Sequence, residues 1–219
     1  REPAVAVSTL LIGGAVSDRL VELSRSAGLI VLGVTSAVAR PLHGILGPVE
    51  DRVAAQAQCP VVTVNGPLQR TDRVRPMVVV GWVDRPSGRG ALSAAAGEAD
   101  ARRGSLTVVS AGLNTDPAAT HRGTSPSGDA LAEALTLLAE RHTGLLIDTV
   151  YAPTDPAEAL LRHAAGSDLL VVGCHHSGNR HSTRIGPVAT ELIRSATCPV
   201  MLVGRTAASS RVTHPATTP

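Results

Sequence analysis

The sequence predicts an α/β protein built on a parallel β-sheet. Short apolar runs without polar alternation recur along the chain, as in LLVV at residues 169–172, and such runs are typical of strands buried on both faces. Segments with helical periodicity separate these runs. Aromatic residues make up only 1% of the 219 residues, so the core must consist of Val, Leu, Ile and Ala packed between sheet and helices.

Residues 76–204 contain a full series of strands alternating with helices. The expected strands are residues 77–81, 106–111, 145–151, 169–172 and 199–203. Helices are expected between consecutive strands, and the third of them has a clear start, because Asp155 is followed by Pro156 and Glu158 in a capping-box pattern. This order implies a five-stranded parallel sheet with right-handed crossovers.

An internal repeat relates the first 65 residues to the end of the chain. The segment GLIVLG at 28–33 matches DLLVVG at 168–173, and QCPV at 58–61 matches TCPV at 197–200, with offsets of 139 or 140 residues. We therefore interpret residues 1–65 as the C-terminal half of a first copy, with strands expected at 5–12, 29–32 and 61–64. Residues 66–75 are interpreted as a linker, 76–204 as a complete second copy and 205–219 as a disordered tail.

Composition excludes several classes of partner. The net charge is only +2 and the arginines are interleaved with acidic residues, so a nucleic-acid partner is not expected. No apolar run reaches the length of a membrane span. Three cysteines, an odd number, indicate reduced thiols and a cytoplasmic protein.

A glycine-containing loop is the main functional signal. Gly173 ends the strand at 169–172, and Gly186 with Pro187 opens the helix that follows the loop. A loop between a parallel strand and a helix N-terminus directs backbone N–H groups and the positive end of the helix dipole to the carboxyl edge of the sheet. Anions bind at such an edge.

Over residues 4–204 the chain resembles the tandem members of the universal stress protein family. The resemblance rests on the VVVG strand followed by Asp84, the DPAEALL helix at 155–161, the SDLLVVG strand at 167–173, the glycine loop and CPVMLV at 198–203. It implies a flavodoxin-like fold, of the adenine nucleotide alpha hydrolase-like type, with strand order 3-2-1-4-5 in each copy and an N-terminally truncated first copy. Asp84 and Gly173 would line the crevice between strands one and four.

The resemblance also implies a nucleotide site with altered chemistry. ATP-binding members carry glycine, two residues, glycine, nine residues, glycine and then Ser or Thr; this chain keeps Gly173 and Gly186 but has His176 and Pro187 at the other two positions. A histidine side chain obstructs close backbone approach, and proline removes a hydroxyl and an N–H donor. The residues expected to line the site are Asp84, Ala111, Gly173, His176, Gly186 and Val188.

The leading hypothesis is a non-enzymatic stress-response regulatory protein with a degenerate nucleotide site and no required cofactor. The alternative is an adenine nucleotide binder, for ATP, with weak ATPase activity at most; an enzyme of the related hydrolase-like fold is the third choice. Cys174, His175, His176 and His181 suggest zinc ligands, but a solvated polar loop is the preferred interpretation. No catalytic or metal-binding residue is predicted.

The fifth strands of the two copies suggest how the chain assembles. Family members commonly pair these strands across a dimer, which predicts antiparallel pairing of residues 61–64 with 200–203 in an intramolecular pseudo-dimer, or the equivalent contact in a homo-oligomer. Residues 29–32 would then form an exposed edge or pair directly with residues 5–12.

Overall fold

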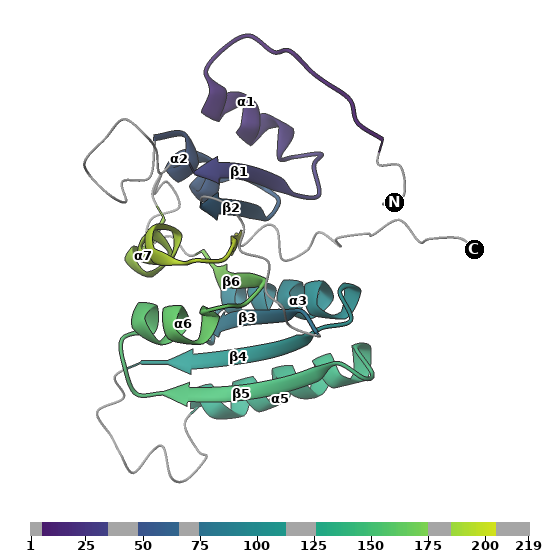
Figure 1. Ribbon diagram of the computed structural model, residues 1–219, viewed down its shortest axis with the longest axis vertical. Coiled ribbons are helices and arrows are strands. Elements are labelled where there is room, and N and C mark those ends of the chain that lie inside the picture. The colour runs from purple at the N-terminus through teal and green to yellow at the C-terminus, as the bar shows by residue number, and fades with distance from the viewer. Residues whose placement is uncertain (1–5, 35–47, 66–74, 113–125, 175–184, 205–219) are drawn as a thin grey trace.

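The computed structural model describes residues 6–34, 48–65, 75–112, 126–174 and 185–204, and these form one continuous seven-stranded sheet covered by helices (Figure 1). Its strand order is β1-β2-β7-β6-β3-β4-β5. The strands are β1 (Ile30–Val34), β2 (Val61–Asn65), β3 (Met77–Trp82), β4 (Ser105–Ala111), β5 (Leu146–Ala152), β6 (Leu169–Gly173) and β7 (Val200–Val203). The helices are α1 (Val16–Leu23), α2 (Pro48–Gln56), α3 (Pro86–Ala101), α5 (Pro126–Arg141), α6 (Pro156–Ala164) and α7 (Pro187–Ser195).

The expected parallel α/β sheet is confirmed. The neighbouring strands β5, β4, β3, β6 and β7 are all parallel, and they come from residues 146–152, 105–111, 77–82, 169–173 and 200–203. Helices α3 and α5 pack on one face of this sheet and α6 and α7 on the other. The sheet differs from the predicted five strands because β1 and β2 extend it to seven.

Hydrogen bonds to two carboxylates fix the position of α6 and of the strand after it. The Asp155 carboxylate accepts hydrogen bonds from the Ala157 amide at 2.9 Å and the Glu158 amide at 3.2 Å, so α6 begins where the capping pattern predicts. After α6, the Asp168 carboxylate accepts a hydrogen bond from the Met77 amide at 2.8 Å. The beginning of β3 is thereby joined to the segment that leads into β6.

Strands β2 and β7 form an antiparallel seam between the two repeats, which confirms the predicted pairing. Val62 lies opposite Met201 and Thr63 opposite Val200. The Thr63 side chain is fully buried, and its hydroxyl donates to the Val200 carbonyl oxygen at 3.3 Å. Val62 belongs to the core that α3 and α5 cover, so this core extends across the seam.

The strand predicted at residues 5–12 is wrong for residues 6–12, which are described and contain no strand. Val7 is 86% exposed and Leu11 is 99% exposed. An apolar run becomes a strand only where a neighbouring strand supplies hydrogen bonds, and among the described residues β1 pairs with β2 alone. Of the two outcomes expected for residues 29–32, the exposed edge is the one found.

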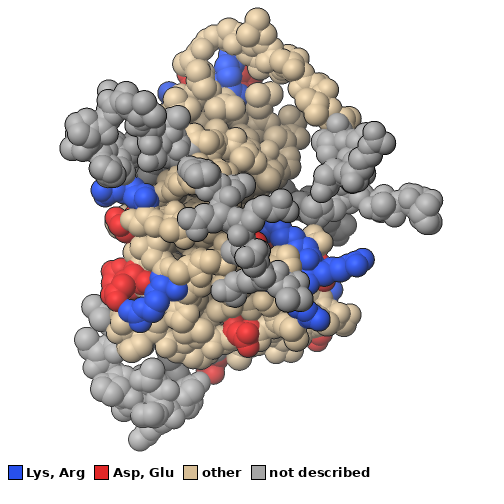
Figure 2. All heavy atoms as spheres, viewed as in Figure 1, with Lys and Arg blue, Asp and Glu red and all other residues tan. Residues whose placement is uncertain are grey.

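The predicted tail lies outside the described residues, as do residues 66–74 of the predicted linker. None of the helices that the structure describes combines the length and the apolar character needed to cross a membrane. On the face shown in Figure 2, basic and acidic side chains are scattered over a mostly uncharged surface.

A buried charge tests the seam. We expect Val62→Asp to lower the free energy of unfolding by at least about 3 kcal/mol, because Val62 is 8% exposed and a carboxylate there would lose its water without gaining a partner. Val31→Asp is the matched control, since Val31 is 61% exposed on β1. Urea unfolding followed by the emission of Trp82, the one tryptophan in the chain, measures both variants. Equal losses would contradict a buried seam.

Candidate functional site

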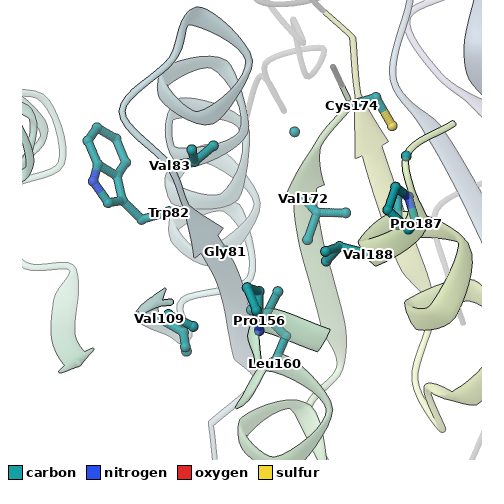
Figure 3. A pocket seen from close by; sticks show the side chains of 14 residues that line it. Gly81, Trp82, Val83, Val109, Pro156, Leu160, Val172, Cys174, Pro187 and Val188 are labelled. Atoms are coloured by element: carbon teal, nitrogen blue, oxygen red, sulfur yellow. The ribbon is translucent and has the colours of Figure 1, made fainter. Parts of the chain in front are cut away.

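A cavity of about 290 Å³ lies at the carboxyl ends of β3 and β6 (Figure 3). The chain continues from β3 toward β4 on one side and from β6 toward β7 on the other, so the cavity lies at the topological switch point of these strands. The residues that line it come from the ends of β3, β4 and β6 and the beginnings of α6 and α7: Gly81, Trp82, Val83, Val109, Ala111, Pro156, Leu160, Val172, Gly173, Cys174, Gly186, Pro187, Val188 and Ala189.

The walls of the cavity are apolar. In Figure 3 the Val172 and Val188 side chains lie close together on one side, and Pro156 and Leu160 lie beside Gly81. The Trp82 indole points away from Val172 and packs in the core on the opposite face of the sheet. Among the described lining residues none has a charged side chain. Such walls suit a flat or apolar group, and polar contacts must come from the backbone.

The beginning of α7 supplies that backbone. Gly186 occupies the N-cap position in an extended conformation, and Pro187 is the first helical residue. The amides of Val188 and Ala189 lie in the first turn, where the helix provides no carbonyl acceptor for them. Proline has no N–H and no hydroxyl. An anion at this helix end could therefore bind the amides of Val188 and Ala189 and the positive end of the helix dipole. Residue 187 adds neither an N–H nor a hydroxyl contact.

Gly173 has a steric reason to be glycine that involves no ligand. A Cβ atom at this position would lie 2.5 Å from the Ser87 carbonyl oxygen and 3.0 Å from the Gly88 nitrogen, at the beginning of α3. Ser87 is itself buried. The end of β6 and the first turn of α3 therefore pack backbone against backbone, which only glycine permits.

Asp84 lies outside the cavity lining. Its carboxylate is exposed and forms an ion pair with Arg89 at 3.3 Å, and Arg89 also lies 3.8 Å from Glu133. Asp84 follows the end of β3 and precedes Pro86, the first residue of α3, so the chain has already turned toward that helix when it reaches Asp84.

Of the six residues predicted from the sequence, four line the cavity. These are Ala111, Gly173, Gly186 and Val188. His176 lies outside the described residues. The apolar wall was not predicted from the sequence, although Pro156 and Leu160 are four residues apart on α6 and thus share a helix face.

Cys174 contributes a thiol to the lining that is 3% exposed. Burial raises the pKa of this thiol to about 12, so it stays protonated near neutral pH and is a poor nucleophile. Burial likewise raises the pKa values of Cys59 and Cys198, and the Ser167 hydroxyl donates to the Cys198 sulfur at 3.3 Å.

The zinc hypothesis gains no support from the part of the chain that the structure describes. Within it, no three His, Cys, Asp or Glu side chains lie close enough to hold a metal ion. His175, His176 and His181, three of the four residues considered for zinc, lie outside the described residues.

The fold and the site together define an α/β protein with an apolar cavity at the switch point of its sheet. A family model described as "Universal stress protein family" matches residues 77–204. A universal stress protein of Mycolicibacterium smegmatis is 30% identical over 206 residues, which cover 91% of this chain and 69% of that protein. The chain therefore belongs to the universal stress protein family.

Further comparisons agree with this assignment. A universal stress protein of Mycobacterium tuberculosis is 29% identical over 195 residues, which cover 84% of this chain and 64% of that protein. The crystal structure of a universal stress protein from Archaeoglobus fulgidus has the same fold, with a TM-score of 0.64 at 17% identity over 86% of this chain and 65% of that chain. The chain thus spans 64–69% of the length of these relatives.

The packing at Gly173 can be tested with a pair of glycine substitutions. Gly173→Ala should lower the free energy of unfolding by about 2 kcal/mol or more, because its Cβ would overlap the Ser87 backbone. Gly97→Ala in α3 should instead raise it by about 0.5–1 kcal/mol, since this position has open space and alanine favours helix. Thermal unfolding compares the two, and a neutral Gly173→Ala would disprove the steric argument.

The buried thiol of Cys174 predicts a loss of stability at alkaline pH. The pKa of the thiol in the folded state lies above the ordinary value of 9.0. The stability that the protonated thiol contributes to the folded state is therefore fully present below pH 9 and is lost as pH rises toward 12. The expected slope is about 1.4 kcal/mol per pH unit. The sequence has no lysine, and Cys59 and Cys198 remain in a Cys174→Ala variant, so the difference between the two unfolding curves isolates this thiol. Parallel pH profiles would contradict the prediction.

Proposed function

We propose that this universal stress protein is a regulatory protein without enzymatic activity, and that its cavity is a degenerate nucleotide site. The observation that carries the proposal is Pro187 at the first position of α7, at a wall where a phosphate would meet helix amides. The cavity takes the base and sugar of an adenine nucleoside and holds a triphosphate poorly.

The two ends of such a ligand need different surroundings. The valine, leucine and proline walls favour an uncharged ring system, which leaves water on entering the cavity. A triphosphate needs several charge-assisted hydrogen bonds, each contributing about 1.5–3 kcal/mol. Residue 187 supplies none of them, and His176 stands in the sequence where ATP-binding members carry glycine.

The absence of enzymatic activity is part of the proposal. Among the described lining residues there is neither a histidine nor a carboxylate that could act as a general base. The Cys174 thiol, with its pKa raised to about 12, lacks the thiolate character that a nucleophile requires.

We further propose that the chain acts in the cytoplasm as an intramolecular pseudo-dimer. Strands β3 to β7 form a module of order 3-2-1-4-5, and β2 provides the fifth strand of the other copy. The antiparallel β2–β7 seam supports this proposal, because it covers two apolar strands that would otherwise be edges.

Adenine nucleotide binding, with ATP as the ligand, is the second candidate. The position of the cavity at the switch point and the first-turn amides of Val188 and Ala189 favour it. In that case the 175–184 loop, whose sequence includes His175, Arg180 and Arg184, would supply the positive charge that the described walls lack.

Calorimetric titration with adenosine, ADP and ATP separates the two candidates. We expect adenosine to bind at least as tightly as ATP, and ATP to bind with a Kd weaker than about 10 μM, which corresponds to roughly −7 kcal/mol. Tighter ATP binding would overturn the degenerate site. Phosphate release measured with Mg²⁺ present then distinguishes a binder from an ATPase.

A double substitution locates the defect in the same assay. His176→Gly with Pro187→Ser should tighten ATP binding at least about tenfold, because it restores a hydroxyl, an N–H donor and close backbone access. Adenosine affinity should stay unchanged and is the control. A folded double variant with unchanged ATP affinity would show that the loop residues are not the cause.

A further inference from the structure

Helix α7 forms one wall of the cavity and is held at both ends by side chains of the first repeat. Before its beginning, the Ile185 amide donates to the Asp51 carboxylate at 3.3 Å. At its other end, the Asn65 side-chain amide donates to the Ile193 carbonyl oxygen. Strand β2 pairs with β7, which follows α7. The first repeat therefore sets the position of this wall.

The contact of Asp51 places a negative charge beside the anion-attracting end of α7. Asp51 lies in the first turn of α2 and is partly buried, and Ile185 is 8% exposed. The next residue, Gly186, lines the cavity. The positive end of the α7 dipole, which would stabilise a ligand phosphate, thus already interacts with a carboxylate of the protein.

The second repeat has no acid at the position equivalent to Asp51. With the offset of 139 residues, Asp51 corresponds to Thr190 in α7. The Thr190 hydroxyl donates to the Gly186 carbonyl oxygen of its own helix at 3.0 Å. The acid at position 51 thus belongs to the first repeat alone, and it contacts the residue that precedes the N-cap of α7 in the second.

We propose that Asp51 is a specificity-determining residue of this cavity and selects against phosphorylated ligands. The inference rests on the proposed function, because it takes the cavity to bind an adenine nucleoside. Asp51 acts through its charge: a phosphate brought to the amides of Val188 and Ala189 meets a carboxylate at the same helix end, whereas an uncharged nucleoside does not. The effect adds to the missing donor of Pro187.

The test compares adenosine with AMP in calorimetric titrations of the whole chain. Asp51→Asn keeps an oxygen that can accept from the Ile185 amide and removes only the charge. We expect the ratio of the AMP Kd to the adenosine Kd to fall roughly three- to tenfold in this variant. The gain should shrink in about 0.5 M NaCl, where the Debye length is about 4 Å. A purely structural role of Asp51 would change both ligands alike and would not depend on salt.

Glu50→Gln is the matched control, because Glu50 lies one residue earlier in the same turn of α2 and loses the same charge. An equal gain from Glu50→Gln would mean a general charge effect and would overturn the role of Asp51. An unchanged Kd ratio in Asp51→Asn would also overturn the role of Asp51, as would AMP binding that is undetectable before and after the substitution. In either case the proposed function still stands as long as adenosine binds. If adenosine does not bind the unaltered chain, both the proposed function and this inference fail.

Discussion

The antiparallel pairing of β2 with β7 is the interaction on which the rest of the structure depends. Each strand is strongly apolar, and without the other each would expose a row of backbone donors and acceptors beside buried valines. Their pairing turns two incomplete hydrogen-bonding edges into the interior of one sheet. It also brings the first turn of α2 to the beginning of α7, where Asp51 accepts a hydrogen bond from Ile185, the residue before the cavity-lining Gly186.

Two residues of the cavity have roles in folding that do not depend on a ligand. Gly173 matches a glycine of the nucleotide motif, yet its contact with Ser87 requires glycine whether or not a ligand binds. Pro187 is a good first residue for a helix and a poor partner for phosphate. Both residues thus satisfy the demands of folding, and neither is evidence for a bound triphosphate.

Much of the fold could be predicted from the sequence, because its signals are local. The capping pattern at Asp155 fixes where α6 begins. The seam was expected from the resemblance to a family that pairs its fifth strands, and the internal repeat identifies the two strands concerned. The features that could not be predicted depend on distant partners. Residues 6–12 have an apolar pattern but no neighbouring strand among the described residues, and local pattern carries no information about that.

The candidate site was predictable to a similar degree. Strand ends and helix beginnings place Ala111, Gly173, Gly186 and Val188 at one edge of the sheet, and the structure agrees. The direction of Asp84 depends on how the chain turns into α3, and the contact of Asp51 joins residues 134 positions apart. Neither has a sequence signature.

The seam also constrains the order in which the chain can fold. Thr63 and its partner Val200 are separated by 137 residues, and contacts between such distant residues carry a large loop-closure cost. During synthesis β2 leaves the ribosome long before β7 is made. The apolar edge of β2 therefore stays unpaired until the whole second repeat has been translated. The first repeat therefore acquires its stable partner last, and this interval is when chaperones have the most reason to bind the nascent chain.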